Sequence, residues 1–129
     1  MTEPTSFAHE DECTWVYDEP DPGDTDRVRW RTLVSADVTP SAGVTFGVCE
    51  VPPGAQLAPH HHHPQEVYYV AAGEAEVFMN GAWTPVRKGH VAYHPGDAVH
   101  GIRNRGSETF VLVWTFPTDT LAEIEYFDD

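Results

Sequence analysis

Glycine and proline interrupt this chain at short intervals from Arg27 onward, and no stretch of ten or more residues there has the hydrophobic periodicity of an α-helix. The segments between these breaks are rich in the β-branched and aromatic residues typical of strands. The sequence therefore predicts an all-β fold, and about eight short strands at this spacing are typical of a two-sheet jelly roll. The expected strands are Val28–Val34, Val44–Val51, Glu66–Ala72, Glu74–Asn80, Trp83–Val86, His90–His94, Val99–Asn104 and Thr109–Phe116.

One turn is specified closely by its residues. Asn80 and Gly81 lie between two strand-like segments, and an Asn-Gly pair in this position is typical of a type I′ hairpin. Both central residues of that turn take positive φ, which asparagine and glycine tolerate. We therefore expect a tight hairpin at this point.

The 129 residues are enough for one domain with a hydrophobic core. Acidic residues dominate before Arg27, so we expect residues 1–27 to form an acidic N-terminal arm and residues 28–129 to form the barrel. Thr14–Tyr17 has enough β-forming bulk to dock as a short edge strand. Residues 1–12 are expected to form a solvated tail or a loose arm, and their deletion to cost little stability.

The charge balance excludes some partners. With 21 acidic and 7 basic residues, the net charge of −14 repels nucleic acid and anionic membranes. No apolar run approaches the ~20 residues of a membrane span and the N-terminus is acidic, unlike a secretory signal, so we expect a cytoplasmic protein. Cys13 and Cys49 are too few for a disulfide framework and are interpreted as structural thiols. Edge strands in a small β-domain favour a homodimer.

A histidine-rich segment, residues 54–66, carries the chemistry. Side chains alternate along a strand, so His60 and His62 point to one face, and Glu66 can rejoin that face after the turn at Pro64. His100 follows a second turn and can reach the same pocket from another strand. Imidazoles and a carboxylate bind divalent transition metals, so the sequence predicts a site for one Fe, Mn, Ni, Zn or Co ion.

The other histidines are treated separately. Alternation points His61 and His63 away from the proposed site, so both are interpreted as surface residues. His90 and His94 remain open. His94 either lines the mouth of the pocket or is an ordinary histidine at a strand end.

These residues fall in a recognisable order. Gly54, His60, His62, Glu66 and Gly73 are spaced as in the first motif of the cupin superfamily, which this part of the chain resembles. The second cupin motif is similar to residues 89–104, with Asp97 in place of a turn glycine. The resemblance covers about residues 28–127 and implies a double-stranded β-helix with a metal inside the barrel.

A narrower likeness concerns reaction type. Residues 29–31, 66–70, 116–119 and 123–127 look like those of short single-domain cupins that include the DddK-type dimethylsulfoniopropionate lyases. That resemblance implies catalytic roles for Tyr68 and Tyr126. Tyr68 also follows Glu66 by two residues and shares its face, and a nearby divalent ion favours the phenolate. The alternative is that the Tyr68 ring only fills the barrel.

Three functions follow from these observations. The first is a metal-dependent lyase acting on a small β-substituted carboxylate, with Tyr68 or Tyr126 removing the α-proton. The second is a dioxygenase, isomerase or polyketide cyclase on the same scaffold. The third is a non-catalytic cupin that binds a sugar or metabolite, in which the ion only orients the ligand. An open coordination position favours catalysis over binding alone.

Overall fold

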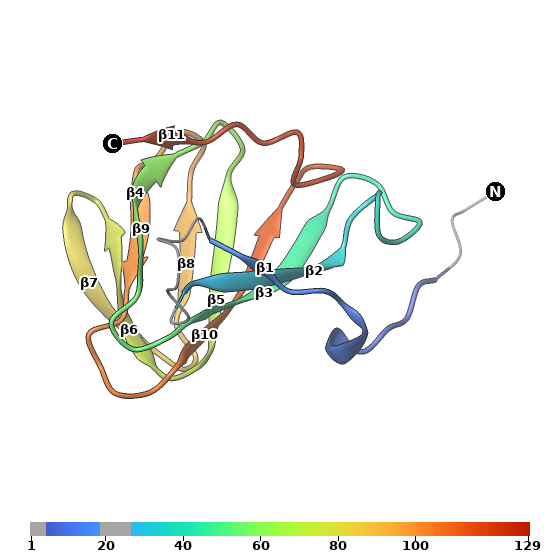
Figure 1. Ribbon diagram of the computed structural model, residues 1–129. Helices are drawn as coiled ribbons and strands as arrows, with labels where there is room; N and C mark the ends of the chain where they lie inside the picture. Colours follow the sequence, from blue (N-terminus) through green and yellow to red (C-terminus); the bar gives the residue numbers. More distant parts are fainter. Residues whose placement is uncertain (1–4, 19–26) are drawn as a thin grey trace.

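The computed structural model describes residues 5–18 and 27–129, which form two antiparallel sheets facing each other (Figure 1). The larger sheet has the order β1-β2-β3-β10-β5-β8 and the smaller one β11-β4-β9-β6-β7. This is the expected double-stranded β-helix. The elements are η1 (Glu10–Glu12), β1 (Val16–Tyr17), β2 (Arg29–Val34), β3 (Thr45–Val51), β4 (Gln56–His61), β5 (Glu66–Ala72), β6 (Glu74–Met79), β7 (Ala82–Arg87), β8 (Val91–His94), β9 (His100–Arg103), β10 (Phe110–Phe116) and β11 (Phe127–Asp128).

All eight expected strands are present, and no end differs from the expected bound by more than one residue. The structure adds strand β4, which carries His60 and His61 and lies outside the eight expected strands. Pro59 lies inside β4, and the pairing of β4 with β9 shifts between Leu57 and His60. Proline has no N–H to donate to a neighbouring strand, which accounts for the weak strand signal and the irregular register.

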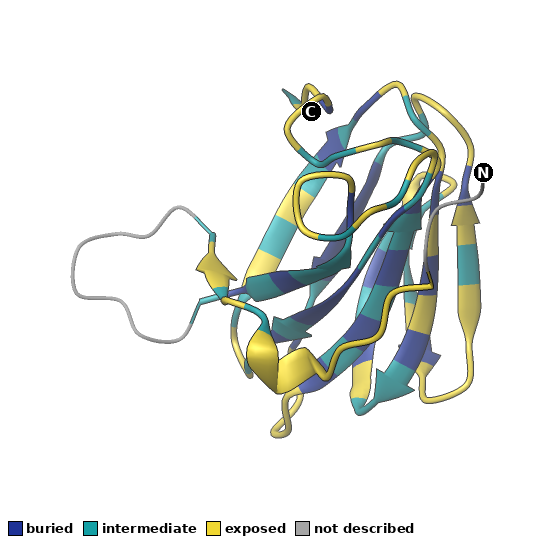
Figure 2. Ribbon diagram, turned by 90° about the vertical axis from the view of Figure 1, so that its right-hand side faces the viewer, coloured by how far each residue is buried: buried dark blue, intermediate teal, exposed yellow. Residues whose placement is uncertain are grey.

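The core lies between the sheets and is built by alternation. Phe110, Leu112, Trp114 and Phe116 of β10 are buried, while the residues between them point to the outer surface. Figure 2 shows the resulting alternation of buried and more exposed positions along the strands. Residues from β3, β5, β6 and β9 complete the same cluster. The space between the two sheets is therefore filled by one hydrophobic core.

Two turn positions require their residues. Asn80 and Gly81 have φ of 53° and 78° and join β6 to β7, so the predicted type I′ hairpin is confirmed. Gly73 has φ of 80°, and a Cβ there would lie 2.6 Å from the carbonyl oxygen of Thr109. Only glycine fits that close approach between the β5–β6 turn and the chain entering β10.

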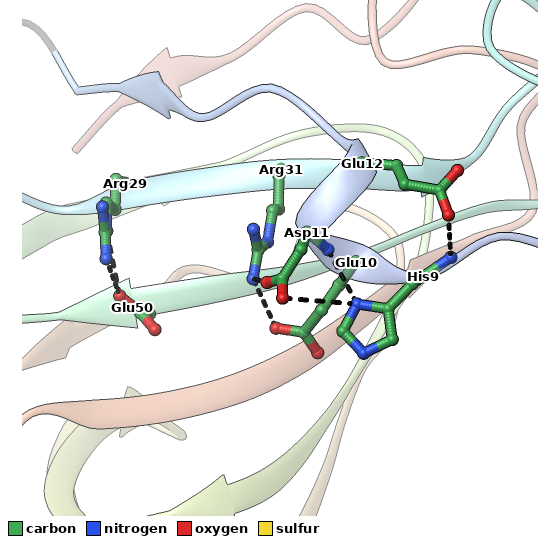
Figure 3. A network of polar contacts seen from close by, with 7 residues as sticks. All are labelled: His9, Glu10, Asp11, Glu12, Arg29, Arg31 and Glu50. Carbon is green, nitrogen blue, oxygen red and sulfur yellow. Dashed lines mark hydrogen bonds and ion pairs between the residues drawn. The ribbon is translucent and has the colours of Figure 1, made fainter.

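The described part of the N-terminal arm is docked on the barrel. Strand β1 pairs with β2, and the ring of Trp15 packs against the guanidinium groups of Arg29 and Arg31, 3.9 and 4.1 Å from its centroid. Glu10 Oε1 accepts a hydrogen bond of 2.5 Å from the buried Arg31 side chain, and Asp11 lies 3.5 Å from it (Figure 3). Residues 10 and 11 therefore do not lie in a solvated tail. Because they neutralise a buried cation, we expect the deletion of residues 1–12 to cost more stability than the sequence alone predicts. Residues 1–4 and 19–26 of the expected arm lie outside the described part.

The C-terminal segment differs from what its sequence pattern predicts: Ala122, Ile124 and Tyr126 alternate with Leu121, Glu123 and Glu125, which predicts a strand whose apolar face closes the barrel. Residues 121–124 form a turn, closed by a 3.0 Å hydrogen bond from Ile124 N–H to the Leu121 carbonyl, and only β11 pairs with β4. Ile124 is buried, but Ala122 and Tyr126 are exposed, so the expected apolar face is limited to one residue. Across the described residues, no helix is long and apolar enough to cross a membrane.

Candidate metal centre

Three buried histidines meet at one end of the barrel. His60 lies in β4, His62 follows the end of β4, and His100 begins β9, which pairs with β4 directly opposite His60. One ring nitrogen from each of the three lies within 4.8 Å of the others. The two strands therefore bring together residues that are 40 positions apart along the sequence.

Backbone hydrogen bonds orient all three rings. The Nδ1 atoms of His60 and His100 lie 2.8 and 2.9 Å from the carbonyl oxygens of Ala58 and Ala98, two residues earlier in each case. His62 Nδ1 lies 2.8 Å from the carbonyl oxygen of Pro64. Because a carbonyl only accepts, each Nδ1 carries a proton, and each Nε2 faces the site, where it acts as the ligand atom once it has no proton of its own. This arrangement suits a divalent transition metal and is maintained by the backbone.

Glu66 lies beside the three rings at the start of β5. Its Oε1 is 3.2 Å from His62 Nε2 and 3.1 Å from His100 Nε2. Burial raises the pKa of the Glu66 carboxyl, but the hydrogen bonds from His100 and His62 outweigh this and hold the pKa below its usual value. The carboxylate is thus ionised among the imidazoles, and the donor set of three nitrogens and one oxygen fits a divalent ion such as Fe, Mn, Ni, Zn or Co.

The neighbouring histidines follow the expected alternation. His61 is half-buried against Phe127 and its Nδ1 lies 2.5 Å from Asp129, while His63 is exposed and lies 2.5 Å from Asp97. Both rings point away from the His60–His62–His100 cluster. Asp97 itself has φ of 65°, so an aspartate tolerates the turn where the cupin motif often has glycine.

His94 belongs to the site, which the sequence left open. Its ring stacks on His100 with centroids 4.3 Å apart and meets the edge of the Tyr68 ring at 4.6 Å. The side chain is buried, and its Nε2 has no hydrogen-bond partner within the described part of the chain. Burial, together with the neighbouring His100, lowers the pKa of His94 from 6.5 to about 4. No local sequence pattern predicts this placement. It depends on the pairing of β8 with β5, which puts His94 opposite Glu66.

A cavity of about 630 Å³ opens onto this cluster, and both candidate tyrosines line it together with His60 and Glu66. Its walls are mainly apolar and aromatic, with Trp30, Trp114 and Phe116 among them. None of the described residues that line it is lysine or arginine, whereas Asp18 and Asp128 do line it. The cavity therefore offers an anionic ligand no basic side chain other than imidazole.

The two tyrosines differ in position. Tyr68 is 3% exposed and its ring centroid lies 5.9 Å from that of His100, whereas Tyr126 is 51% exposed and lies 5.3 Å from His62. Burial and the nearby Glu66 carboxylate raise the pKa of both phenols above the usual value. Each is a neutral phenol in the protein alone. A positive charge at the histidine cluster would act in the opposite direction and favour the phenolate.

Two further residues have structural roles. The Asn104 side-chain amide donates to the carbonyls of Val51 and Glu108, at 2.9 and 2.7 Å, and so joins the ends of β3 and β9. Cys49 lines the cavity, but burial raises the pKa of its thiol, so it remains protonated. This supports the interpretation of Cys49 as a structural thiol.

Comparison with known proteins identifies the fold family. The cupin domain family matches residues 47–116, which include the histidine cluster, Glu66 and the turns at Gly73 and Gly81. The chain belongs to the cupin family. Its relatives include the dimethylsulfoniopropionate lyase DddW of Ruegeria pomeroyi, 36% identical over 99 residues, which are 77% of this cupin and 64% of that protein.

Solved structures agree on the architecture. The polyketide cyclase RemF of Streptomyces resistomycificus has a TM-score of 0.79 at 18% identity over 97% of this chain and 85% of RemF. The lyase DddQ of Ruegeria pomeroyi has a TM-score of 0.76 at 22% identity over 92% of this chain and 61% of DddQ. Both likenesses concern the fold. The matched regions make up between 55% and 64% of the curated relatives' own lengths.

Proposed function

We propose that this cupin is a metal-dependent lyase that acts on a small β-substituted carboxylate, with dimethylsulfoniopropionate as the first candidate. His60, His62, Glu66 and His100 would hold one divalent ion. When bound, that ion supplies a positive charge that holds a carboxylate and stabilises negative charge developing next to it. The observation that carries the proposal is the set of three Nδ1-anchored imidazoles, one of which, His60, lines a cavity together with two tyrosines.

The charge of the cavity supports a substrate held through the ion. A free carboxylate entering this cavity meets Glu66 and no lysine or arginine among the described lining residues. Without a metal, the substrate would therefore be repelled. The aromatic walls, in turn, suit a sulfonium group, since cations bind favourably over aromatic faces. A zwitterion with a carboxylate at one end and a sulfonium at the other matches both features, and the 36% identity to DddW points the same way.

Tyr68 is the proposed general base. Its hydroxyl belongs to a buried ring beside His94 and His100, so water is largely excluded from it. As phenolate it would take the α-proton, the β-carbon–sulfur bond would break, and the bonding pair would leave on dimethyl sulfide. The remaining product is acrylate, and the proton stays on the Tyr68 oxygen until solvent removes it. Tyr126, half-exposed beside His62, is proposed to position the substrate or to pass the proton released at Tyr68 to solvent.

The volume of the cavity favours a second candidate. About 630 Å³ is within the range of sites that hold drug-sized ligands, and it is larger than dimethylsulfoniopropionate requires. A polyketide cyclase or an isomerase with a larger substrate would use that space. Such a reaction would need the same ligand set, but its substrate would bury far more of Trp30 and Trp114.

A headspace assay separates these functions. Purified, untagged protein is loaded in turn with Fe, Mn, Ni, Zn or Co and incubated with dimethylsulfoniopropionate and other β-substituted carboxylates. The proposal predicts release of dimethyl sulfide with at least one metal and loss of that release after chelation. Absence of turnover with every metal and every carboxylate would reject the lyase and leave the cyclase, isomerase or ligand-binding alternatives.

A further inference from the structure

The outer surface of the larger sheet has a patch without charge. Four large hydrophobic residues of the paired strands β5 and β8 are strongly exposed there: Val67, Tyr69, Val91 and Tyr93, at 36%, 49%, 67% and 59%. The adjacent strand β10 extends the patch with Val113 beside Tyr69 and Thr115 beside Val67. We call Val67, Tyr69, Val91 and Tyr93 the outer quartet. Contiguous exposed apolar surface of this kind marks a binding surface more often than free solvent-facing strands.

The charge of the rest of the chain makes this patch unusual. The protein has 21 acidic residues and a net charge of −14, so two copies repel each other across most of their surfaces. The outer quartet and its neighbours on β10 carry no charge at all, and charge depletion with tyrosine enrichment is typical of the centre of protein interfaces. A second copy could therefore approach this face without bringing carboxylates together.

The register of the quartet shows that it is self-complementary. Val67 lies opposite Tyr93 and Tyr69 lies opposite Val91, so the two tyrosines occupy one diagonal of a square and the two valines the other. A two-fold rotation about an axis in the plane of the face, along or across the strands, exchanges the diagonals. Each tyrosine of one copy then lies over a valine of the other, and large side chains fill the space above small ones.

We propose that the outer quartet is the centre of a two-fold homodimer interface formed by the faces of β5 and β8. The occupant is a second copy of this chain, because the pattern of large and small side chains fits its own two-fold image. This interface lies on the outside of the sheet whose inner face carries Glu66 and Tyr68, so each barrel keeps its own cavity. The homodimer expected from edge-strand pairing would thus form by packing of faces.

The test is the mass of the full chain in solution, measured by light scattering or sedimentation equilibrium. Wild type should have about twice the 14.4 kDa of one chain. Val91→Glu places a carboxylate in the interface and should give a single chain. Val38→Glu is the matched control and should remain a dimer, since Val38 is 53% exposed in the turn after β2, and β3 and β10 lie between β2 and the strands of the quartet.

A second variant distinguishes an interface with complementary side-chain shapes from non-specific hydrophobic association. Val67→Tyr combined with Val91→Tyr keeps the face apolar but fills both hollows, so the dimer should weaken about tenfold or more. Association as tight as wild type would reject this complementarity and point to a different apolar partner or orientation. A monomeric wild type, or a dimeric Val91→Glu variant that keeps its circular dichroism spectrum, would reject the interface. Metal content is unchanged in all outcomes, so this test is independent of the lyase proposal.

Discussion

The contact between the N-terminal arm and Arg31 gives the clearest prediction about stability. The Arg31 guanidinium is 9% exposed and is neutralised by Glu10 at 2.5 Å and Asp11 at 3.5 Å. A hydrogen bond to a charged group contributes about 1.5–3 kcal/mol. Glu10 is 46% exposed and Asp11 remains nearby, so Glu10→Ala should cost about 1–1.5 kcal/mol. Deletion of residues 1–12 removes both carboxylates and should cost about 2–3 kcal/mol.

These free energies convert to measurable shifts in melting temperature. For a chain of this size, each kcal/mol lowers Tm by roughly 3–6 °C, so the deletion should lower Tm by on the order of 10 °C and Glu10→Ala by about 5 °C. Differential scanning calorimetry measures both. Glu12→Ala is the matched control, because within the described residues the Glu12 carboxylate accepts one hydrogen bond, from the His9 N–H at 3.4 Å in the same exposed turn. It should change Tm by less than about 1 °C.

A double-mutant cycle tests the cause. If the cost arises from an unpaired buried cation, Arg31→Met in the Glu10→Ala background should recover part of the lost stability. Equal shifts for Glu10→Ala and Glu12→Ala would refute the reasoning. So would additive losses in the Glu10 and Arg31 double variant.

Three other predictions concern the barrel. His62→Ala should lower bound metal, measured by elemental analysis, at least tenfold while His61→Ala retains it; equal loss from both would contradict the assigned faces. Because the folded-state pKa of His94 is lowered from 6.5 to about 4, the unfolded chain binds more protons in that window and stability falls as pH drops through it. His94→Leu removes this titratable group, so between pH 6.5 and 4 the free energy of unfolding of the metal-free variant should fall by up to about 3 kcal/mol less than that of wild type. Urea titrations measure it, and the same pH dependence in both proteins would contradict this prediction. Ile124→Ala should cost about 2–5 kcal/mol, because Ile124 is the buried residue of the C-terminal turn; a loss below 1 kcal/mol would mean that this turn does not close the barrel.

The sequence was sufficient for eight of the strands and for the direction of the central histidines. Both depend on local rules: strand residues have period two, and Gly or Pro separate the strands. His60 and His62 are therefore buried while His63 is exposed. The hairpin at Asn80 and Gly81 is equally local, since its geometry depends on the φ angles of two adjacent residues.

What the sequence did not provide depends on contacts between distant residues. His94 enters the site because it pairs with Glu66 across two strands, and Arg31 is buried because a carboxylate 21 residues earlier reaches it. Residues 121–126 alternate in hydrophobicity but pair with no strand in the described part of the chain, and they form a turn and irregular backbone. Register and pairing are set by the whole barrel, and no local pattern encodes them.

The central claim is that Tyr68 acts as a metal-assisted base, and turnover by Tyr68→Phe tests it most directly. The substitution removes one hydroxyl from a buried ring and leaves the four proposed ligands intact. With wild-type metal content and melting temperature as controls, release of dimethyl sulfide should fall by about 10²–10⁴-fold with little change in KM. Turnover within about threefold of wild type would show that the ring only fills the barrel and would contradict the proposed mechanism.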